Sequence, residues 1–479
     1  MSETIIGQWP AILPPLLSIA LAIWTREVHL SLFFGLWLGF SLLAGDPLSG
    51  LADTLDGGIA VLTDAGDARV VLFSALVGAL IALTQRSGGV GGLIDWLARR
   101  SLVATPRQAM LLSALIGVLV FVESSITSLV NGAVCRPIFD RLKVSREKLA
   151  FLCDATAAPI CILIPLNAWG AYVTNLLTKE GVADPLEVFV ASIPMNLYAL
   201  ITVAFVFIYV VALRRDFGPM KAAENRVHET GAISNPGSSP PIDPSLTELD
   251  APAGKPRRAV NMLVPIAVLA AMMPLGLFIT GDGDLLKGSG SKAVFWSVLA
   301  AIAVAFALPV AQRILTFRDA RDTAWRGIGS LVPLAGLMIL AFALGALAKK
   351  LGTGAFVADA LAQDLPGALV PAMVFAIGCF ISFSTGTSWG TFALLMPLAL
   401  PLAEATGVPI PLALAAVLSG GVFGDHCSPI SDTTLVASLA SGCDHVDHVK
   451  TQLPYALVCG LVAFVGFLVL GALMTATPT

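Results

Sequence analysis

The chain has 479 residues, of which 56% are hydrophobic and only 13% are charged, and its formal net charge is −4. Because soluble domains carry about 25% charged residues, this composition excludes an ordinary soluble protein. It predicts an all-α polytopic membrane protein surrounded by the lipid bilayer. The charge balance offers no basic surface, so no nucleic-acid partner is expected.

Ten apolar segments are long enough to cross a bilayer, which takes about 20 residues. They are 9–25, 28–45, 68–86, 149–178, 187–213, 259–280, 292–311, 327–348, 409–440 and 451–475. No basic region of a cleaved signal peptide precedes the first segment, so we expect it to remain as a span. The acidic stretch 46–67 is expected to be a loop outside the membrane.

Two further apolar regions, 106–141 and 366–402, are too long for one span. Small polar residues divide each region near its middle, at 123–128 in the first and at 382–388 in the second. Each half is about 14–17 residues, which is short of a full crossing. We therefore expect two re-entrant helical hairpins.

Basic residues predict the orientation in the membrane. They flank the first hairpin on both sides, at Arg86–Arg107 and at Arg136–Lys148. The positive-inside rule places both flanks in the cytoplasm. Tracing the spans from there puts both termini outside, in the periplasm if the protein lies in a cell inner membrane. The second hairpin then opens to the outside.

The two halves of the chain resemble one another. Residues 80–98 resemble 344–362, and in each half a hairpin and then a polar break with proline follow in the same order. Five spans plus one hairpin in each half make the repeats inverted, with broken helices at the midplane, as in many secondary transporters. The expected domains are a first repeat at 1–214, a second at 259–479, and a polar, poorly ordered cytoplasmic linker at 215–258 between them.

The two breaks place ionisable residues at membrane depth, where such residues are costly and usually functional. A proline inside a helix frees the carbonyl four residues earlier, and Pro159 and Pro429 stand in the two breaks. If helical spacing persists, Asp425, Ser428 and Asp432 share one face and form a Na⁺ site. Oxygen ligands suit Na⁺ rather than a transition metal, and a proton can compete with Na⁺ for the same carboxylate.

Other oxygen-bearing side chains lie near the breaks and the hairpin tips. The further candidates for cation or proton binding are Thr433, with the neighbouring Thr434, and Asp154, Thr156, Ser125, Thr127, Ser384, Thr385 and Thr387. The candidates for binding an organic solute are Asn131, Asn167, Trp169, Ser388 and His426, with Tyr172 beside them.

Each candidate also has a structural interpretation. The hydroxyls at the tips can cap half-helices, the aspartates can hold freed backbone N–H groups, and His426 can be a hydrogen-bonded structural histidine. The aromatic residues can lie at the membrane interface, as can Asp95 and Asp359, and Glu123 can pair with a basic residue. The segment Asp444–His448 could bind a metal or hydrogen-bond the end of a helix.

The seven cysteines lie mostly inside apolar segments and lack the spacing of a metal site. We interpret them as small buried apolar residues. No cofactor is expected beyond Na⁺ as a coupling or transported ion.

The run GGVFGDHCSPISDTT (420–434), followed by SGCDHVDHVKTQLPYAL (441–457), resembles the signature of the NhaC family of Na⁺/H⁺ antiporters. A weaker resemblance extends over the first half through ESSITSLVNG and DATAAPI. The resemblance implies a scaffold domain, a transport domain with elevator-type movement, and a homodimer. It also supports Asp425, Ser428 and Asp432 as cation or proton ligands. Relatives with this signature include exchangers of organic solutes.

The leading prediction is a secondary active transporter that exchanges Na⁺ for H⁺. The alternative is a Na⁺- or H⁺-coupled carrier of a small amino acid or carboxylate on the same fold. An ATP-driven pump or a membrane enzyme is not favoured, because the sequence has no G-x-x-x-x-G-K-[ST] phosphate-binding loop. A channel is disfavoured because inverted repeats with paired hairpins imply alternating access.

Overall fold

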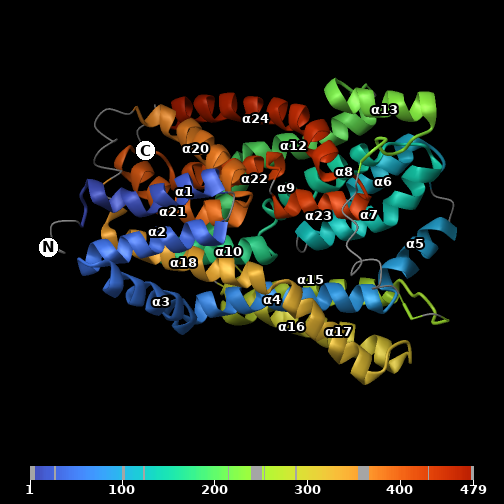
Figure 1. The fold of residues 1–479 in the computed structure, drawn as a ribbon, viewed down its shortest axis with the longest axis horizontal. Helices are drawn as coiled ribbons and strands as arrows, with labels where there is room; N and C mark the ends of the chain where they lie inside the picture. Colours follow the sequence, from blue (N-terminus) through green and yellow to red (C-terminus); the bar gives the residue numbers. More distant parts are fainter. Residues whose placement is uncertain are drawn as a thin grey trace.

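A computed structural model describes most of the chain. The described residues are 6–25, 28–99, 103–121, 124–213, 215–238, 251–252, 254–285, 288–353, 356, 366–429 and 431–475. Over these ranges the chain is helical and contains no strand. Most of its helices run roughly along the long axis of the molecule (Figure 1).

In the first half the elements are η2 (Trp9–Ile12), α1 (Leu13–Thr25), α2 (Val28–Ala44), α3 (Pro47–Thr63), α4 (Ala65–Arg86), α5 (Gly89–Arg99), α6 (Pro106–Leu119), α7 (Ser124–Arg141), α8 (Arg146–Ala155), α9 (Ala158–Cys161), α10 (Ala168–Lys179), α11 (Pro185–Ser192), η3 (Ile193–Met195), α12 (Leu197–Ile208) and η4 (Tyr209–Leu213).

In the second half they are α13 (Gly218–Thr230), α15 (Val260–Thr280), α16 (Gly290–Ala311), α17 (Phe317–Ser330), α18 (Val332–Leu351), η5 (Gly367–Leu369), α20 (Val370–Thr385), α21 (Ser388–Ala405), α22 (Ile410–Cys427), α23 (Asp432–Ser441) and α24 (His445–Thr475).

Long apolar helices make this a polytopic membrane protein. Within the described ranges, α4, α15, α16, α22 and α24 are each long and apolar enough to cross a membrane. The segments 185–195 and 197–213 form a sixth span if they are counted together, bent by 48°. Other expected spans, such as 149–178, consist of shorter or interrupted helices. The two hairpin regions fold as the helix pairs α6–α7 and α20–α21, while their re-entrant course and the inverted repeat stay predictions.

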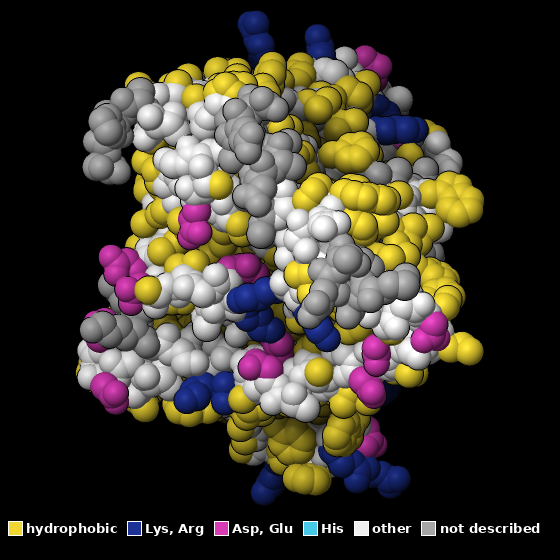
Figure 2. Space-filling view, turned by 90° about the vertical axis from the view of Figure 1, so that its left-hand side faces the viewer, with side chains coloured by type: hydrophobic (Ala, Val, Ile, Leu, Met, Phe, Trp, Pro, Cys, Tyr) yellow, Lys and Arg dark blue, Asp and Glu magenta, His cyan; other side chains and the backbone are white. Residues whose placement is uncertain are grey.

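The start of α1 and the end of α24 both lie at the left end of the molecule (Figure 1). The two ends of the described chain are therefore on one side. Figure 2 looks onto this end, where acidic and basic side chains gather near the middle of the face among hydrophobic ones. Which side of the membrane this end faces stays a prediction.

The expectation that 46–67 is a loop is wrong, because residues Pro47–Thr63 form α3; its placement outside the membrane stays a prediction. Asp46 caps this helix by accepting hydrogen bonds from the backbone N–H groups of Leu48 and Ser49 at 3.0 and 2.9 Å. A proline at the first helical position also favours a helix start. Of the acidic residues that suggested a loop, Asp53 and Asp56 lie on the exposed side of α3, whereas Asp67 is buried in α4.

The expectation of a poorly ordered linker is wrong for residues 218–230, which form α13. The apolar side of α13 is buried, and the helix packs against α8 and α24. Lys148, at the start of α8, pairs with Asp216 at 2.9 Å and with Glu224 at 3.2 Å. These ion pairs attach the linker to the helix that ends at the first break.

Glycines bring α22 close to α20 of the second hairpin. A Cβ atom on Gly420 would lie 2.6 Å from the carbonyl oxygen of Phe375, and one on Gly424 would lie 2.4 Å from the backbone nitrogen of Phe383. The two helices therefore meet backbone to backbone, as small residues allow in membrane helices. This contact places the end of α22 beside the tip of the second hairpin.

Candidate functional site

The second break separates α22 from α23. The backbone is extended at Ser428, where ψ is 132°, and at Ser431, where ψ is 135°. Helical spacing therefore stops at Cys427, and the expectation that Asp425, Ser428 and Asp432 share one helical face is wrong. Ser428 is buried, whereas the side chain of Asp432 lies outside the described part of the structure.

Asp425 is fully buried at the end of α22. Ser388, at the start of α21, donates its hydroxyl to Oδ2 at 2.6 Å, and its backbone N–H lies 3.3 Å from the same oxygen. Ser431, the N-cap of α23, donates its hydroxyl to Oδ1 at 2.5 Å, and the hydroxyl of Thr433 lies 3.0 Å from that of Ser431. No ion pair to Asp425 exists among the described residues. The hairpin and the break thus surround a buried carboxylate with hydroxyl groups.

Asp154 occupies the corresponding position in the first break, near the end of α8, and is also fully buried. Its Oδ2 accepts hydrogen bonds from Gln452 Nε2 at 2.7 Å and from Thr434 Oγ1 at 3.0 Å. The Nε2 atoms of His426 and His448 each lie 3.9 Å from the same oxygen. Its Oδ1 has no hydrogen-bond partner in the described structure. A buried oxygen without a partner is costly, so this carboxylate is suited to hold a proton or a cation.

Two residues connect the carboxylate of Asp154 to the backbone of the second break. Thr434 Oγ1 lies 3.0 Å from Asp154 Oδ2 and 3.2 Å from the carbonyl oxygen of Asp425. A hydroxyl has one proton, so it can donate to only one of these acceptors at a time. Gln452 Nε2 also donates to the carbonyl oxygen of His426 at 2.5 Å, and its Oε1 lies 3.0 Å from His448 Nε2.

Sequence reasoning missed Gln452. The signal that could have found it is its position in α24, where an amide stands four residues after His448 at the start of a long apolar run. Residues four apart on a helix share a face. Gln452 and His448 therefore point together toward Asp154.

The hydrogen-bonding interpretation of Asp444–His448 is confirmed. Asp444 Oδ1 accepts from the backbone N–H groups of Val446 and Asp447 at 2.9 and 3.1 Å, which caps the start of α24. His448 Nδ1 lies 2.8 Å from Ser438 Oγ. Over the ranges that the structure covers, no group of three or more His, Cys, Asp or Glu side chains could hold a metal ion.

His426 combines the expected structural role with a place in the site. Its Nδ1 lies 2.7 Å from the hydroxyl of Tyr198, which fixes the ring. Its Nε2 faces Asp154 without a hydrogen-bond partner in the described structure. The ring therefore brings an available nitrogen to the carboxylate of the other break.

The first hairpin and its neighbouring break use several candidate side chains for structure. Thr127 donates its hydroxyl to the carbonyl oxygen of Val120, and Thr156 donates its hydroxyl to that of Leu152 at 2.6 Å. These hydrogen bonds agree with the interpretation that the hydroxyls satisfy helix ends. The candidates Ser125, Ser384 and Thr385, together with Glu123 and Asp359, have side chains outside the described part of the structure.

Two candidates keep buried oxygens without partners among the described residues. Asn131 donates its amide N–H to the carbonyl oxygen of Ser113 at 2.9 Å, while its Oδ1 has no partner. Thr387, at the tip of the second hairpin, has an Oγ1 without a partner. Both oxygens remain available to a ligand.

Asn167 closes the first break. Its Oδ1 accepts from the backbone N–H of Gly170 at 3.0 Å, which caps α10. Its Nδ2 donates to the carbonyl oxygens of Phe121 and Cys161 at 2.9 and 2.8 Å. Both the oxygen and the nitrogen of its side-chain amide therefore make structural hydrogen bonds, and the side chain offers little to a solute.

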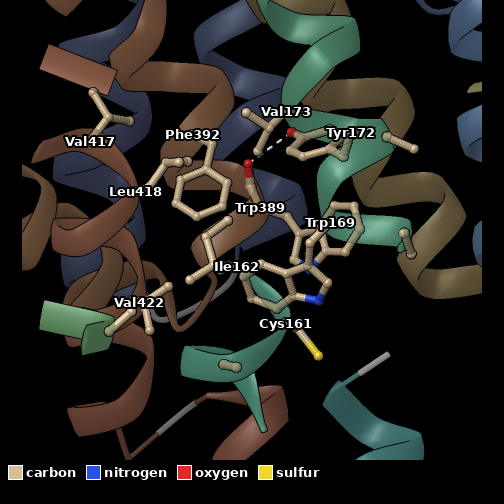
Figure 3. Packing of buried hydrophobic residues seen from close by; sticks show 14 of the residues in the cluster. Cys161, Ile162, Trp169, Tyr172, Val173, Trp389, Phe392, Val417, Leu418 and Val422 are labelled. Carbon is tan, nitrogen blue, oxygen red and sulfur yellow. Dashed lines mark hydrogen bonds between the residues drawn. The ribbon is translucent and has the colours of Figure 1, made fainter. Parts of the chain in front are cut away.

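Trp169 and Tyr172 belong to a buried aromatic cluster between α10 and α21 (Figure 3). The hydroxyl of Tyr172 donates to the carbonyl oxygen of Trp389 at 2.8 Å. The rings of Trp169 and Trp389 are 5.4 Å apart, and the indole Nε1 of Trp169 has no partner among the described residues. These rings are buried, which excludes the expected alternative that they lie at the membrane interface.

The fold and the site together define a secondary transporter of the membrane, built on broken helices with buried carboxylates. A model of the Na⁺/H⁺ antiporter family matches residues 178–472, which is more than half of the chain. The chain therefore belongs to the Na⁺/H⁺ antiporter family, and the resemblance to the NhaC family is confirmed.

Two relatives and one solved structure extend this comparison. An uncharacterized protein of Haemophilus influenzae is 32% identical over 96% of this chain and 90% of its own length. The malate-2H⁺/Na⁺-lactate antiporter of Bacillus subtilis is 38% identical over 19% of each chain. The YdaH transporter of Alcanivorax borkumensis has a similar fold, with a TM-score of 0.54 over 88% of this chain and 89% of that chain at 15% identity.

Proposed function

We propose that this protein exchanges Na⁺ for H⁺ across a cell inner membrane. The observation that carries the proposal is Asp425, a fully buried carboxylate that accepts hydroxyl hydrogen bonds from Ser388 of the second hairpin and Ser431 of the break. Carboxylate, hydroxyl and carbonyl oxygens are ligands that a small hard cation prefers. Na⁺ and a proton compete for this carboxylate, which is the simplest basis for antiport.

Asp154 supplies a second acidic group for the exchange. Its Oδ1 has no partner among the described residues, and two histidine nitrogens lie 3.9 Å from its Oδ2. The Thr434 hydroxyl bridges Asp154 and the backbone of Asp425. Because this hydroxyl can donate to only one acceptor at a time, a change of charge at Asp154 alters its hydrogen bond to the second break. Asp432 remains a proposed further ligand of Na⁺, together with Ser428.

The proposed movement is an elevator-type alternating access. Two inverted repeats, 1–214 and 259–479, would each contribute a hairpin and a broken helix to the moving domain, and the working unit would be a homodimer. The packing of α23 against α7 and α8 supports this arrangement, because it joins elements of both halves beside the two breaks.

The test uses proteoliposomes with an imposed Na⁺ gradient and a pH-sensitive dye in the lumen. We expect Na⁺-driven proton movement without any added organic solute. Asp425→Asn and Asp154→Asn should each abolish the coupled flux. Asp322→Asn is the matched control, because Asp322 lies on α17 in a half-exposed ion pair with Arg321. Wild-type flux in both site variants would overturn the assignment.

The second candidate function is the coupled transport of a small organic solute. The name of the Bacillus subtilis relative favours it, and so does the buried indole N–H of Trp169 without a partner in the described structure. The same proteoliposomes separate the two functions. If the lumenal pH responds to Na⁺ only when a carboxylate or an amino acid is present, the second function replaces the first.

A further inference from the structure

A polar cavity of about 540 Å³ lies outside the site around Asp425 and Asp154. Its walls are formed by the start of α4, the end of α10, the start of α11, the end of α15 and the start of α16. None of the candidate residues named above lines it. Its volume lies in the range of cavities that bind small molecules.

The cavity wall carries a cation without a counter-ion. Arg69 of α4 is half-buried and forms no hydrogen bond or ion pair with any described residue. Lys179, the other basic residue of the wall, is paired with the buried Asp67. Desolvating a guanidinium without a partner is unfavourable, so the wall is suited to receive an anion at Arg69.

Two acidic residues of the wall do not cancel this charge. Asp64 and Asp184 are both exposed, whereas Arg69 is half-buried. The carboxylate of Asp64 accepts the backbone N–H of Asp67 at 2.9 Å and thereby caps α4. The cavity therefore has acidic groups open to solvent and a more buried basic group.

Backbone donors add to the positive potential. The N-cap of α16, Ser289, and the N-cap of α11, Asp184, make no side-chain capping hydrogen bond. The first N–H groups of a helix have no partner within it and carry partial positive charge. Gly290 and Ser291 of α16 and Leu186 of α11 line the cavity. Together with Arg69, these donors match a carboxylate.

We propose that this cavity is a binding site for a small organic carboxylate, held by the guanidinium of Arg69 and the first-turn N–H groups of α16. The exposed Asp64 and Asp184 leave room for an ammonium group at the other end of the same solute, as in an amino acid. The site goes beyond Na⁺/H⁺ exchange and does not depend on chemistry at Asp425. α10 connects the two regions, since Thr174 and Asn175 line the cavity and Asn167 caps the same helix at the first break.

The test is calorimetric titration of the full-length protein in detergent. The probes are choline acetate, which presents a carboxylate alone, and L-alanine, which adds the ammonium group. Choline chloride at equal ionic strength is the reference. We expect saturable binding of at least one of the two probes and none of chloride. Because no gradient and no Na⁺ are present, the result is independent of whether the protein exchanges Na⁺ for H⁺.

Arg69→Gln should weaken this binding about tenfold or more, because a hydrogen bond to a charged partner contributes at least about 1.4 kcal/mol, a factor of ten. Arg69→Lys should bind with intermediate affinity, since it keeps the charge but loses the planar fork of donors. Arg326→Gln, at an exposed position of α17 that does not line the cavity, is the control. Thr178→Trp, which fills the cavity from its exposed wall, should also remove binding.

Circular dichroism and size-exclusion chromatography confirm that each variant is folded before titration. The proposal is overturned if neither probe binds saturably, if chloride binds as well as the carboxylates, or if Arg69→Gln binds like the wild type. Retained binding in Thr178→Trp would also place the ligand elsewhere.

Discussion

Removing the Ser388 hydroxyl tests the proposed cation site directly. Ser388→Ala deletes a buried 2.6 Å hydrogen bond to Asp425 and with it one proposed oxygen ligand for Na⁺. A hydrogen bond to a charged group contributes about 1.5–3 kcal/mol, and short charge-assisted bonds are the strong ones. Each 1.4 kcal/mol is a factor of ten, so the apparent KM for Na⁺ should rise by about tenfold to a hundredfold.

Ser382→Ala is the matched control for this variant. Ser382 is equally buried in the same hairpin and donates its hydroxyl to the carbonyl oxygen of Gly421 at 2.6 Å, an oxygen that Ser388 also approaches at 3.2 Å. It makes no hydrogen bond to Asp425 in the described structure. Na⁺-dependent lumenal pH change in proteoliposomes, measured over a range of Na⁺ concentrations at fixed pH, gives the KM of both variants. An unchanged KM in Ser388→Ala, or an equal rise in both variants, would refute the reasoning.

Three further predictions concern stability and topology. Lys148→Met should lower the free energy of unfolding by about 3 kcal/mol, because it leaves two largely buried carboxylates without their cation. Thermal unfolding checks this prediction. The control is Lys221→Met at an exposed position of α13, which should have little effect. Gly420→Ala should destabilise the protein in the same assay, since its Cβ would meet a backbone oxygen at 2.6 Å, whereas Gly329→Ala has open space and should be tolerated. A cysteine in the exposed position of Glu404 should react with a membrane-impermeant maleimide from outside; labelling only from the cytoplasm would contradict the predicted orientation.

The location of the site was predictable from sequence, because polar residues at membrane depth stand out against an apolar background. The side chains that contact Asp425 were harder to predict. Extrapolating helical spacing from Asp425 to Ser428 and Asp432 failed, because the backbone becomes extended at Ser428. The actual partner Ser388 lies 37 residues away and reaches Asp425 only through the packing of one helix against another. Such packing depends on tertiary contacts that periodicity does not encode.

The prediction of loops at two segments failed for a related physical reason. Acidic and polar composition suggested solvent exposure along the whole of 46–67 and 215–258. Composition averages over a segment, whereas α3 and α13 each bury one side and expose the other. Attention to the three- to four-residue spacing of their apolar positions would have indicated amphipathic helices.

The attachment of α13 to α8 has a mechanical consequence. Lys148 at the start of α8 is bonded to acidic side chains on both sides of the first turn of α13, while Asp154 lies near the other end of the same short helix. A rigid ten-residue helix transmits displacement along its axis. If the carboxylates move across the membrane, α13 moves with them, and the chain that joins α13 to α15 has to span the changing distance. The length of this connecting segment then limits how far the carboxylates can move.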